Sequence, residues 1–534
     1  MTQVAEHPSA PAAIENAAAG APPKVIIIGA GIAGLSCGCY LQMNGISTEI
    51  LEAGELPGGL CTAWKRGHYM FDGCLRWLMG AQPLANGPSV FHQMWRELGA
   101  IAGRKVFLHD NILSIETPDG RSLVVPSDLD KLAIEFKRLA PEDSRLIDRL
   151  VRDARRCLTL EPLKKPIELM PRRDRLREGL RYLPIIPIVL RWKNLSLADY
   201  AARYKNPLLR KTLQVITGNE QMSALVLVMV LAFRARADTG FVAGGSWDFA
   251  MAIADRYQKL GGVIRYNAKV TRILARDHRA VGVQCEDGAA LPAATVVSCA
   301  DGHATIFHML EGRYVDKKIR FLYEQCETFT ALIQISLGIK KLFPGAPPTL
   351  NLVLPEPLRV DDQMSHDSFE VESFDAASGL CAEGATVITV RLPASYQFWL
   401  DLKKNNPRRY RAEKKNLLRK IIAILDRRFP GLAKNIERFD VATPATFVRY
   451  THNWRASYEG WLPTPRLLGR RISYTLPGLK NFYMAGHWVI PGGGLPSAAI
   501  SGREVAQLLC AENGKAFVSD AYQNLKETLV KPAA

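Results

Sequence analysis

KVIIIGAGIAGLSCGCYLQMNGISTEILE, residues 24–52, is the stretch that decides the fold. Its first six residues are almost fully apolar and end in glycine, which is typical of a buried parallel strand. A segment of helical length follows from Ile32 to Met43, and a second strand pattern ends in Glu52. Strand, glycine turn, helix and strand within about 30 residues predict a βαβ unit.

The turn after the first strand carries the pattern GxGxxG, at Gly29, Gly31 and Gly34. The first glycine permits a tight turn, the second lets the backbone approach a pyrophosphate, and the third lets helix and strand pack closely. The helix N-terminus then offers free N–H groups to the phosphates. Glu52, 18 positions after Gly34, is placed to accept both hydroxyls of a ribose. The pattern predicts a dinucleotide site; a glycine turn that merely packs tightly leaves the glutamate unexplained.

Two further glycine-rich segments favour FAD over NAD. PGGL (57–60) follows the ribose acid, and its paired glycines let backbone pass close to a phosphate and ribityl arm. Much later in the chain, NFYMAG (481–486) reads as a strand, and GGGLP (492–496) opens a helix. A helix start aimed at the pyrimidine edge of a flavin would stabilise the negative charge that develops there on reduction.

Composition narrows the function classes. The chain has 534 residues, 48% of them hydrophobic and 23% charged, as in globular proteins with a large core. Its net charge of +17 favours anionic surfaces or ligands. Aromatic residues are not interleaved with the basic runs, so nucleic acid is not an expected partner. Ten cysteines without a CxxC pair predict neither a zinc site nor a disulfide framework, which fits a cytoplasmic protein.

The sequence predicts an α/β fold of two domains. A Rossmann-like FAD-binding domain is expected from three segments, residues 24–90, 241–302 and 476–512. An inserted α+β substrate domain is expected from residues 91–240 and 303–475. The Ala- and Pro-rich residues 1–23 read as a disordered leader and residues 513–534 as a C-terminal tail.

Within the stretch 91–192, which reads as mostly helical, a segment at 172–193 suits a membrane surface. Leu183 to Leu190 is an apolar run with two prolines, flanked by arginines and by Tyr182 and Trp192. The prolines argue against a long helix, and the run is far shorter than the roughly 20 residues of a membrane span. Shallow insertion among anionic headgroups and burial as core both fit. A second basic stretch, 403–420, would add to the same face if the fold brings it there.

Several motifs resemble those of the phytoene desaturase and carotenoid isomerase family, which has the fold of FAD-dependent amine oxidases and Rab-GDP-dissociation inhibitors. They are the stretch 25–59, FDG (71–73), GGVIRYNAKVTRI (261–273), TPATFVRYTHNWRASYEG (443–460) and AGHWVIPGGGLPSAAISG (485–502). Two positions depart from the pattern. Leu60 stands where many relatives have arginine, and His487 stands where carotenoid isomerases have an acid.

The resemblance implies FAD as cofactor and a role for each matching residue. The pyrophosphate would be held by Gly29, Gly31, Ala33 and Gly34, and the adenosine ribose by Glu52. The ribityl side would pass Gly59 and Leu60, and the adenine would meet the backbone of Val270. The ribityl-phosphate arm would lie beside Gly486 and His487, and Leu495 would offer its N–H to the isoalloxazine.

Few side chains stand out as catalytic. His487 is a candidate acid or base, because the ordinary histidine pKa lies near neutrality. The candidates for the substrate side of the flavin are four residues that come later in the chain than the paired glycines: His68, Tyr69, Asp72 and Arg76. Trp247 and Trp488 are candidates for a tunnel wall. Each of these residues also has a purely structural interpretation.

Three functions remain open at this point. The first is an FAD-dependent oxidoreductase acting on C–C or C=C bonds of a long apolar molecule, such as a carotenoid, by desaturation, saturation or cis–trans isomerisation. The second is an amine-oxidase-type flavoenzyme. The third is a lipid carrier without redox activity, as in the Rab-inhibitor branch, for which the intact glycines and Glu52 would have no use. The expected partners are an apolar small molecule and, through peripheral contact, an anionic membrane.

Overall fold

A five-stranded parallel sheet is assembled from three distant parts of the chain. The computed structural model describes residues 25–519, so the predicted leader and residues 520–534 of the predicted tail lie outside it. The strand order is β19-β13-β1-β2-β9, and every neighbouring pair is parallel. The strands are β1 (Val25–Ile28), β2 (Thr48–Leu51), β9 (Val263–Arg265), β13 (Thr295–Ser298) and β19 (Phe482–Met484).

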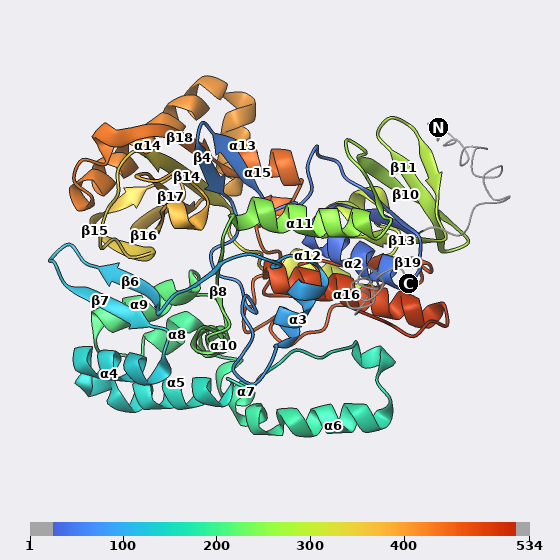
Figure 1. The fold of residues 1–534 in the computed structure, drawn as a ribbon, viewed down its shortest axis with the longest axis horizontal. Coiled ribbons are helices and arrows are strands. Elements are labelled where there is room, and N and C mark those ends of the chain that lie inside the picture. Colours follow the sequence, from blue (N-terminus) through green and yellow to red (C-terminus); the bar gives the residue numbers. More distant parts are fainter. Residues whose placement is uncertain (1–24, 520–534) are drawn as a thin grey trace, which may run out of the picture.

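Helices bury this sheet. All four residues of β1 are buried, as expected of a parallel strand covered on both faces. Helix α2 (Ile32–Met43) packs against both α11 (Gly245–Lys259) and α16 (Gly494–Glu512), as Figure 1 shows. The predicted α/β fold with a Rossmann-like sheet is confirmed.

A seven-stranded sheet forms the second layer and unites the two middle parts of the chain. Its order is β18-β14-β17-β16-β15-β6-β7. The strands are β6 (Asn111–Glu116), β7 (Ser122–Pro126), β14 (Leu332–Ile339), β15 (Thr349–Arg359), β16 (Ser365–Phe374), β17 (Thr386–Pro393) and β18 (Ile436–Ala442). One face shares a hydrophobic core with α13 (Tyr396–Asn405) and α14 (Pro407–Arg428).

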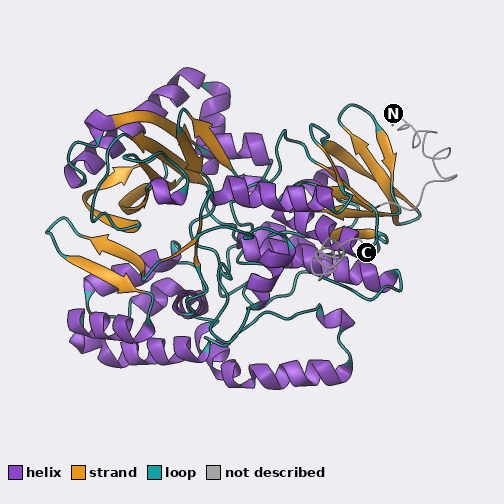
Figure 2. Cartoon of the chain, viewed as in Figure 1, coloured by secondary structure: helices purple, strands orange, loops and turns teal. Residues whose placement is uncertain are grey.

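Most of the remaining helices gather along one side of the molecule, where β6 and β7 lie against them (Figure 2). Seven of them share or border a separate hydrophobic core: α4 (Leu129–Leu139), α5 (Ser144–Arg156), α6 (Arg172–Tyr182), α7 (Ile186–Trp192), α8 (Leu197–Ala201), α9 (Pro207–Thr217) and α10 (Ala224–Ala235). The other helices are α3 (Val90–Glu97), α12 (Lys317–Gln325) and α15 (Pro444–Thr451). The remaining strands, which belong to smaller sheets, are β3 (Ala63–Arg66), β4 (Tyr69–Asp72), β5 (Val106–Leu108), β8 (Gly240–Val242), β10 (Val270–Arg276), β11 (Arg279–Cys285) and β12 (Ala290–Pro292).

The expectation of a mostly helical stretch at 91–192 is wrong between residues 106 and 126, which form β5, β6 and β7. The reason is long-range pairing. Ser114 in β6 lies opposite Leu350 in β15, far along the chain, and no local pattern reveals that partner.

The expectation that the prolines prevent one long helix through the segment 172–193 is confirmed, because a 3₁₀ turn divides the segment into two helices. Helix α6, a single 3₁₀ turn (Leu183–Ile185) and α7 follow one another directly. Pro184 and Pro187 lie in the first turns of the latter two, where a missing N–H costs no hydrogen bond. Trp192 is buried and donates its indole N–H to Asp153 at 2.8 Å, so it is not an interfacial aromatic.

The second basic stretch does not join this segment. Residues 403–420 belong to α13 and α14, which lie at the opposite end of the molecule from α6 in Figure 1. Among residues 25–519, no helix combines the length and the hydropathy needed to cross a bilayer.

Candidate functional site

A cavity of about 1670 Å³ is bordered by both large sheets and by the helical layer. Gly29, Glu52 and Cys299, which directly follow β1, β2 and β13, line one part of it. Ligands of open parallel sheets bind beyond these carboxyl ends. The wall contains all but one of the sequence-predicted cofactor residues: Gly29, Gly31, Ala33, Glu52, Gly59, Leu60, Val270, Gly486, His487 and Leu495.

The three fingerprint glycines face different surroundings. Gly29 has a φ of +97°, which only glycine adopts readily, and its N–H donates to Leu51 O at 2.8 Å. A Cβ on Gly31 would meet no atom within 4 Å, whereas a Cβ on Gly34 would lie 2.0 Å from Gly29 O. Gly31 therefore leaves room on the cavity side, and Gly34, the residue absent from the wall, permits contact between helix and strand.

The start of α2 fits a pyrophosphate. Gly31 is the N-cap residue and has an extended backbone, and no side chain caps the helix. The first N–H groups of the helix consequently remain available toward the cavity, where phosphate oxygens are suitable acceptors.

The Glu52 carboxylate is held in place by two backbone donors. Its Oε2 accepts from Ala30 N–H at 2.7 Å and its Oε1 accepts from Gly54 N–H at 2.8 Å. Each carboxylate oxygen has a further lone pair, so both can accept a ribose hydroxyl as well. The residue fits the role that its spacing predicts.

The start of α16 forms a second glycine-rich wall. Gly492, Gly493 and Gly494 all have positive φ angles, of +94°, +55° and +81°. A Cβ on Gly493 would lie 2.4 Å from the backbone oxygen of Glu459, so this turn packs against the segment 443–460. No side chain caps α16, and Leu495 in its first turn lines the cavity.

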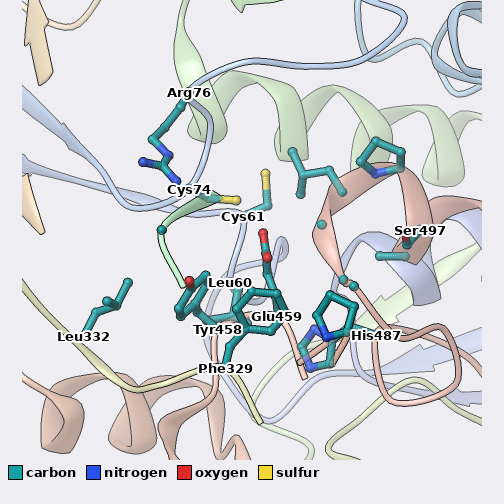
Figure 3. Close-up of a pocket in the computed structure, with 18 of the residues that line it drawn as sticks. Leu60, Cys61, Cys74, Arg76, Phe329, Leu332, Tyr458, Glu459, His487 and Ser497 are labelled. Atoms are coloured by element: carbon teal, nitrogen blue, oxygen red, sulfur yellow. The ribbon is translucent and has the colours of Figure 1, made fainter. Parts of the chain in front are cut away.

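Glu459 is a cavity residue that sequence reasoning missed. Figure 3 shows its carboxyl group pointing into the cavity, among Leu60, Cys61 and His487. Burial raises the pKa of Glu459 to about 7, against the opposing effect of the Arg76 charge. The carboxyl can therefore hold or release a proton near neutral pH. One glutamate among 52 acidic residues gives no sequence signal of this kind.

The structure gives the catalytic candidates different environments. Enclosure by protein lowers the pKa of His487 to about 4, so the premise of a near-neutral pKa is wrong and the ring is uncharged at pH 7. His68 is exposed, and Tyr69 is buried with its hydroxyl donating to Glu437 at 2.9 Å. Asp72 accepts hydrogen bonds from the Ser246 and Cys74 backbones, which ties the end of β4 to the start of α11. Trp247 does not line the cavity, whereas Arg76 and Trp488 do.

A polar face of the seven-stranded sheet also lines the cavity. In register across β15, β16, β17 and β14 lie four polar residues, Asn351, Glu370, Arg391 and Gln334. Arg76 forms an ion pair with Glu370, and Arg391 forms one with Glu372 on β16. The cavity wall is thus apolar in only one part and charged or polar in another.

Comparisons with known proteins agree with this geometry. The family described as flavin containing amine oxidoreductase has a model that matches residues 32–510. The chloroplastic prolycopene isomerase of Arabidopsis thaliana is 24% identical over 509 residues, which cover 92% of this chain and 83% of that protein. A neurosporene-forming phytoene desaturase of Rhodobacter capsulatus is 24% identical over 518 residues, which cover 91% of this chain and 94% of that protein.

Solved structures show the same fold at lower identity. Cyclohexylamine oxidase from Brevibacterium oxydans superposes with a TM-score of 0.58 at 15% identity, over 92% of this chain and 100% of that chain. At this level the likeness concerns the fold alone.

The different surroundings of Gly31 and Gly34 predict different defects. Gly34→Ala should lower the free energy of unfolding by on the order of 3 kcal/mol, because its methyl group collides with backbone. Gly31→Ala should change it by about 1 kcal/mol or less, yet reduce flavin content after gel filtration. Denaturant titration and the flavin absorbance per chain measure the two effects. Full flavin content in Gly31→Ala would mean that this backbone does not meet the cofactor.

The raised pKa of Glu459 predicts a pH-dependent stability. The carboxyl group ionises more readily in the unfolded chain than in the folded one, so its ionisation lowers the free energy of unfolding. This loss is absent below pH 4.5, grows between pH 4.5 and 7, and is complete above pH 7. Glu459→Gln should therefore stabilise the protein by about 2 kcal/mol more at pH 8 than at pH 5. Unfolding curves at both pH values test this, with the exposed Glu55→Gln as matched control. An equal gain at both pH values would contradict the assignment.

Proposed function

Because the chain belongs to the family of flavin-containing amine oxidoreductases, it is an FAD-dependent oxidoreductase, and we propose that it acts on C–C or C=C bonds of a long, largely apolar molecule of the carotenoid or polyene kind. The similarity to a prolycopene isomerase and to a phytoene desaturase, over more than nine tenths of this chain, supports this substrate class. So does the lining of the same cavity, which includes the cofactor residues and also a set of apolar side chains, here called the apolar arm.

The apolar arm is the observation that carries the proposal. One face of α10 and the segment before and within α7 supply its wall: Leu225, Val226, Met229, Val230, Phe233, Ile185, Ile186, Val189 and Leu190. The α10 residues recur at three- and four-residue spacings, so they form one stripe along the helix. An extended apolar molecule can bury much of its surface there, which is favourable by about 25 cal/mol per Å².

We assign the cofactor-binding roles as follows. The N–H groups at Gly31 and Ala33 would bind the pyrophosphate, and Glu52 would bind the ribose. The remaining cavity residues would contact the adenine, the ribityl arm and the isoalloxazine: Val270, Gly59, Leu60, Gly486, His487 and Leu495. Bound FAD supplies hydride chemistry, so the protein's own groups need only orient the reacting carbons and keep water out.

Glu459 is the one titratable cavity residue that we assign to proton handling. Its pKa of about 7 lets the carboxyl oxygen hold or release a proton near neutral pH. His487, with a pKa of about 4, stays neutral and can only donate or accept a hydrogen bond.

The two alternatives fit less well. Amine oxidation would favour an aromatic cage, in which two rings face each other across a gap for the substrate. Phe329 and Tyr458 do not form such a cage, because their rings contact each other at a centroid distance of 5.1 Å and are tilted by 58°. A lipid carrier without redox activity would need neither the space beside Gly31 nor the ordered carboxylate of Glu52.

We further propose peripheral attachment to an anionic membrane through an exposed apolar stripe. The stripe consists of Leu176, Leu180, Leu183, Ile186 and Leu190, which are between 44% and 72% exposed. Their spacing places them on one side of the α6–α7 segment, and exposed arginines surround them. Ile185 and Ile188 face inward and are buried, so the segment is held to the helical core. Ile186 and Leu190 also line the cavity, which suits substrate entry from a bilayer.

Anaerobic incubation of the protein, once with its FAD oxidised and once with its FAD chemically reduced, with a panel of carotenoids, retinoids, unsaturated fatty acids and amines tests the reaction. We expect turnover of polyenes, read by mass spectrometry and chromatography. Loss of two hydrogens identifies a desaturase, gain of two a saturase, and unchanged mass with altered retention an isomerase. Turnover of amines alone would support the amine-oxidase alternative and refute the proposal.

Co-sedimentation with anionic liposomes tests the membrane surface. Replacing Leu176, Leu180 and Leu190 by serine should weaken binding about tenfold or more, because apolar burial in the bilayer is lost. Flavin content should stay unchanged, since these side chains are exposed. Ile134→Ser and Phe439→Ser, at similarly exposed positions elsewhere, serve as matched controls. Binding of the triple variant equal to that of the controls would exclude this surface.

A further inference from the structure

Within the part of the chain that the structure describes, the cavity wall contains one lysine or arginine that lacks an acidic partner. Five lysine and arginine side chains line the cavity: Arg76, Lys211, Arg234, Lys269 and Arg391. Four of them form ion pairs, with Glu370, Asp367, Glu286 and Glu372 in that order. Within residues 25–519, Arg234 takes part in no ion pair.

Arg234 is almost fully enclosed by protein, with 6% of its surface exposed. Its Nη2 donates to Asn111 O at 2.9 Å, and its guanidinium lies over the Trp77 ring, 5.3 Å from the centroid. Its Nε has no hydrogen-bond partner among the described residues. Burial lowers the pKa of Arg234 only to about 10, so the group stays charged at neutral pH. An enclosed charge of this kind is costly unless a counter-charge reaches it.

Arg234 also ends the apolar stripe of α10. The α10 stripe starts near Val226, which packs together with Met222, Phe329 and Tyr458. These two aromatic residues lie next to Leu60 and Glu459 in Figure 3. From Val226 to Arg234 the helix rises by about 12 Å. An apolar wall thus connects the proposed flavin end of the cavity with Arg234, a cation without an ion pair among the described residues.

We propose that Arg234 binds the carboxylate of a substrate whose apolar chain lies along α10 toward Phe329 and Tyr458. The substrate class is then a carboxylate-terminated polyene or unsaturated fatty acid, not a neutral hydrocarbon. This inference rests on the proposed function and narrows its substrate.

The local charge favours a carboxylate over a phosphate ester. A carboxylate brings one negative charge, which the one unpaired guanidinium compensates through charge-assisted hydrogen bonds. A phosphate monoester brings about −1.5 to −2. His109, which also lines this part of the wall, cannot supply the second positive charge, because burial and the Arg234 charge lower its pKa.

A binding experiment with retinoic acid and its methyl ester tests the inference. Binding to the FAD-loaded protein at pH 8 is measured by the quenching of tryptophan fluorescence. We expect the acid to bind about tenfold or more tightly than the ester. Arg234→Gln should abolish this preference, and Arg234→Lys, which keeps the charge without the planar fork, should retain part of it. Lys211→Gln, which removes a cavity cation already paired with Asp367, is the matched control and should keep the full preference.

Equal affinity of the wild-type protein for acid and ester would overturn the inference, even if a variant failed to fold. A preference that persists in stably folded Arg234→Gln would overturn it too. Turnover of neutral carotenoids together with equal acid and ester affinities would leave the proposed function intact and reject only the role of Arg234. An Arg234-dependent preference without turnover of any polyene would support the role of Arg234 and reject the proposed function.

Discussion

The site depends on backbone contact between three elements that glycine alone permits. Helix α2 can start directly after β1 because residue 34 has no side chain, since a Cβ there would lie 2.0 Å from Gly29 O. Helix α16 approaches α2 equally closely at Gly502, where a Cβ would lie 2.3 Å from Ala33 O. The absence of a Cβ at Gly34 and at Gly502 thus allows residues 29–34 and 494–502 to lie in direct contact.

This packing has an electrostatic consequence. The uncapped first turns of α2 and α16 border the same cavity, so the positive ends of two helix dipoles face one enclosed space. Without an anionic ligand, the free N–H groups there must be satisfied by solvent. A dinucleotide that binds only the folded chain stabilises it by mass action, so cofactor binding and the stability of this sheet are linked. The closely packed glycines therefore serve the fold and the cofactor through one geometry.

Local sequence was sufficient wherever the chemistry is local. The βαβ unit, the glycine turn and Glu52 lie within 29 consecutive residues, and their spacing alone predicted the cavity end at which they meet. Glu459 and Arg234 were beyond reach, because their properties come from burial by elements hundreds of residues away. The strands between residues 106 and 126 were missed for the same reason, since β6 pairs with β15 and β5 pairs with β8, both far along the chain. The predicted domain boundaries and the cofactor contacts of individual residues stay predictions.

The charged part and the apolar part of the cavity wall differ in how their charges are paired. On the seven-stranded sheet, strand alternation sends apolar residues toward α13 and α14 and polar residues toward the cavity. Cross-strand register then puts Glu370 opposite Arg391, and Arg76 and Glu372 complete the cluster. These charges neutralise one another inside the wall, so an apolar molecule can lie beside them without stripping water from an unpaired ion. On α10 the opposite holds, since an apolar stripe ends in the Arg234 guanidinium, which forms no ion pair within residues 25–519. If the proposed carboxylate binds at Arg234, the helix, and not the sheet, is the element that selects the polar end of the substrate.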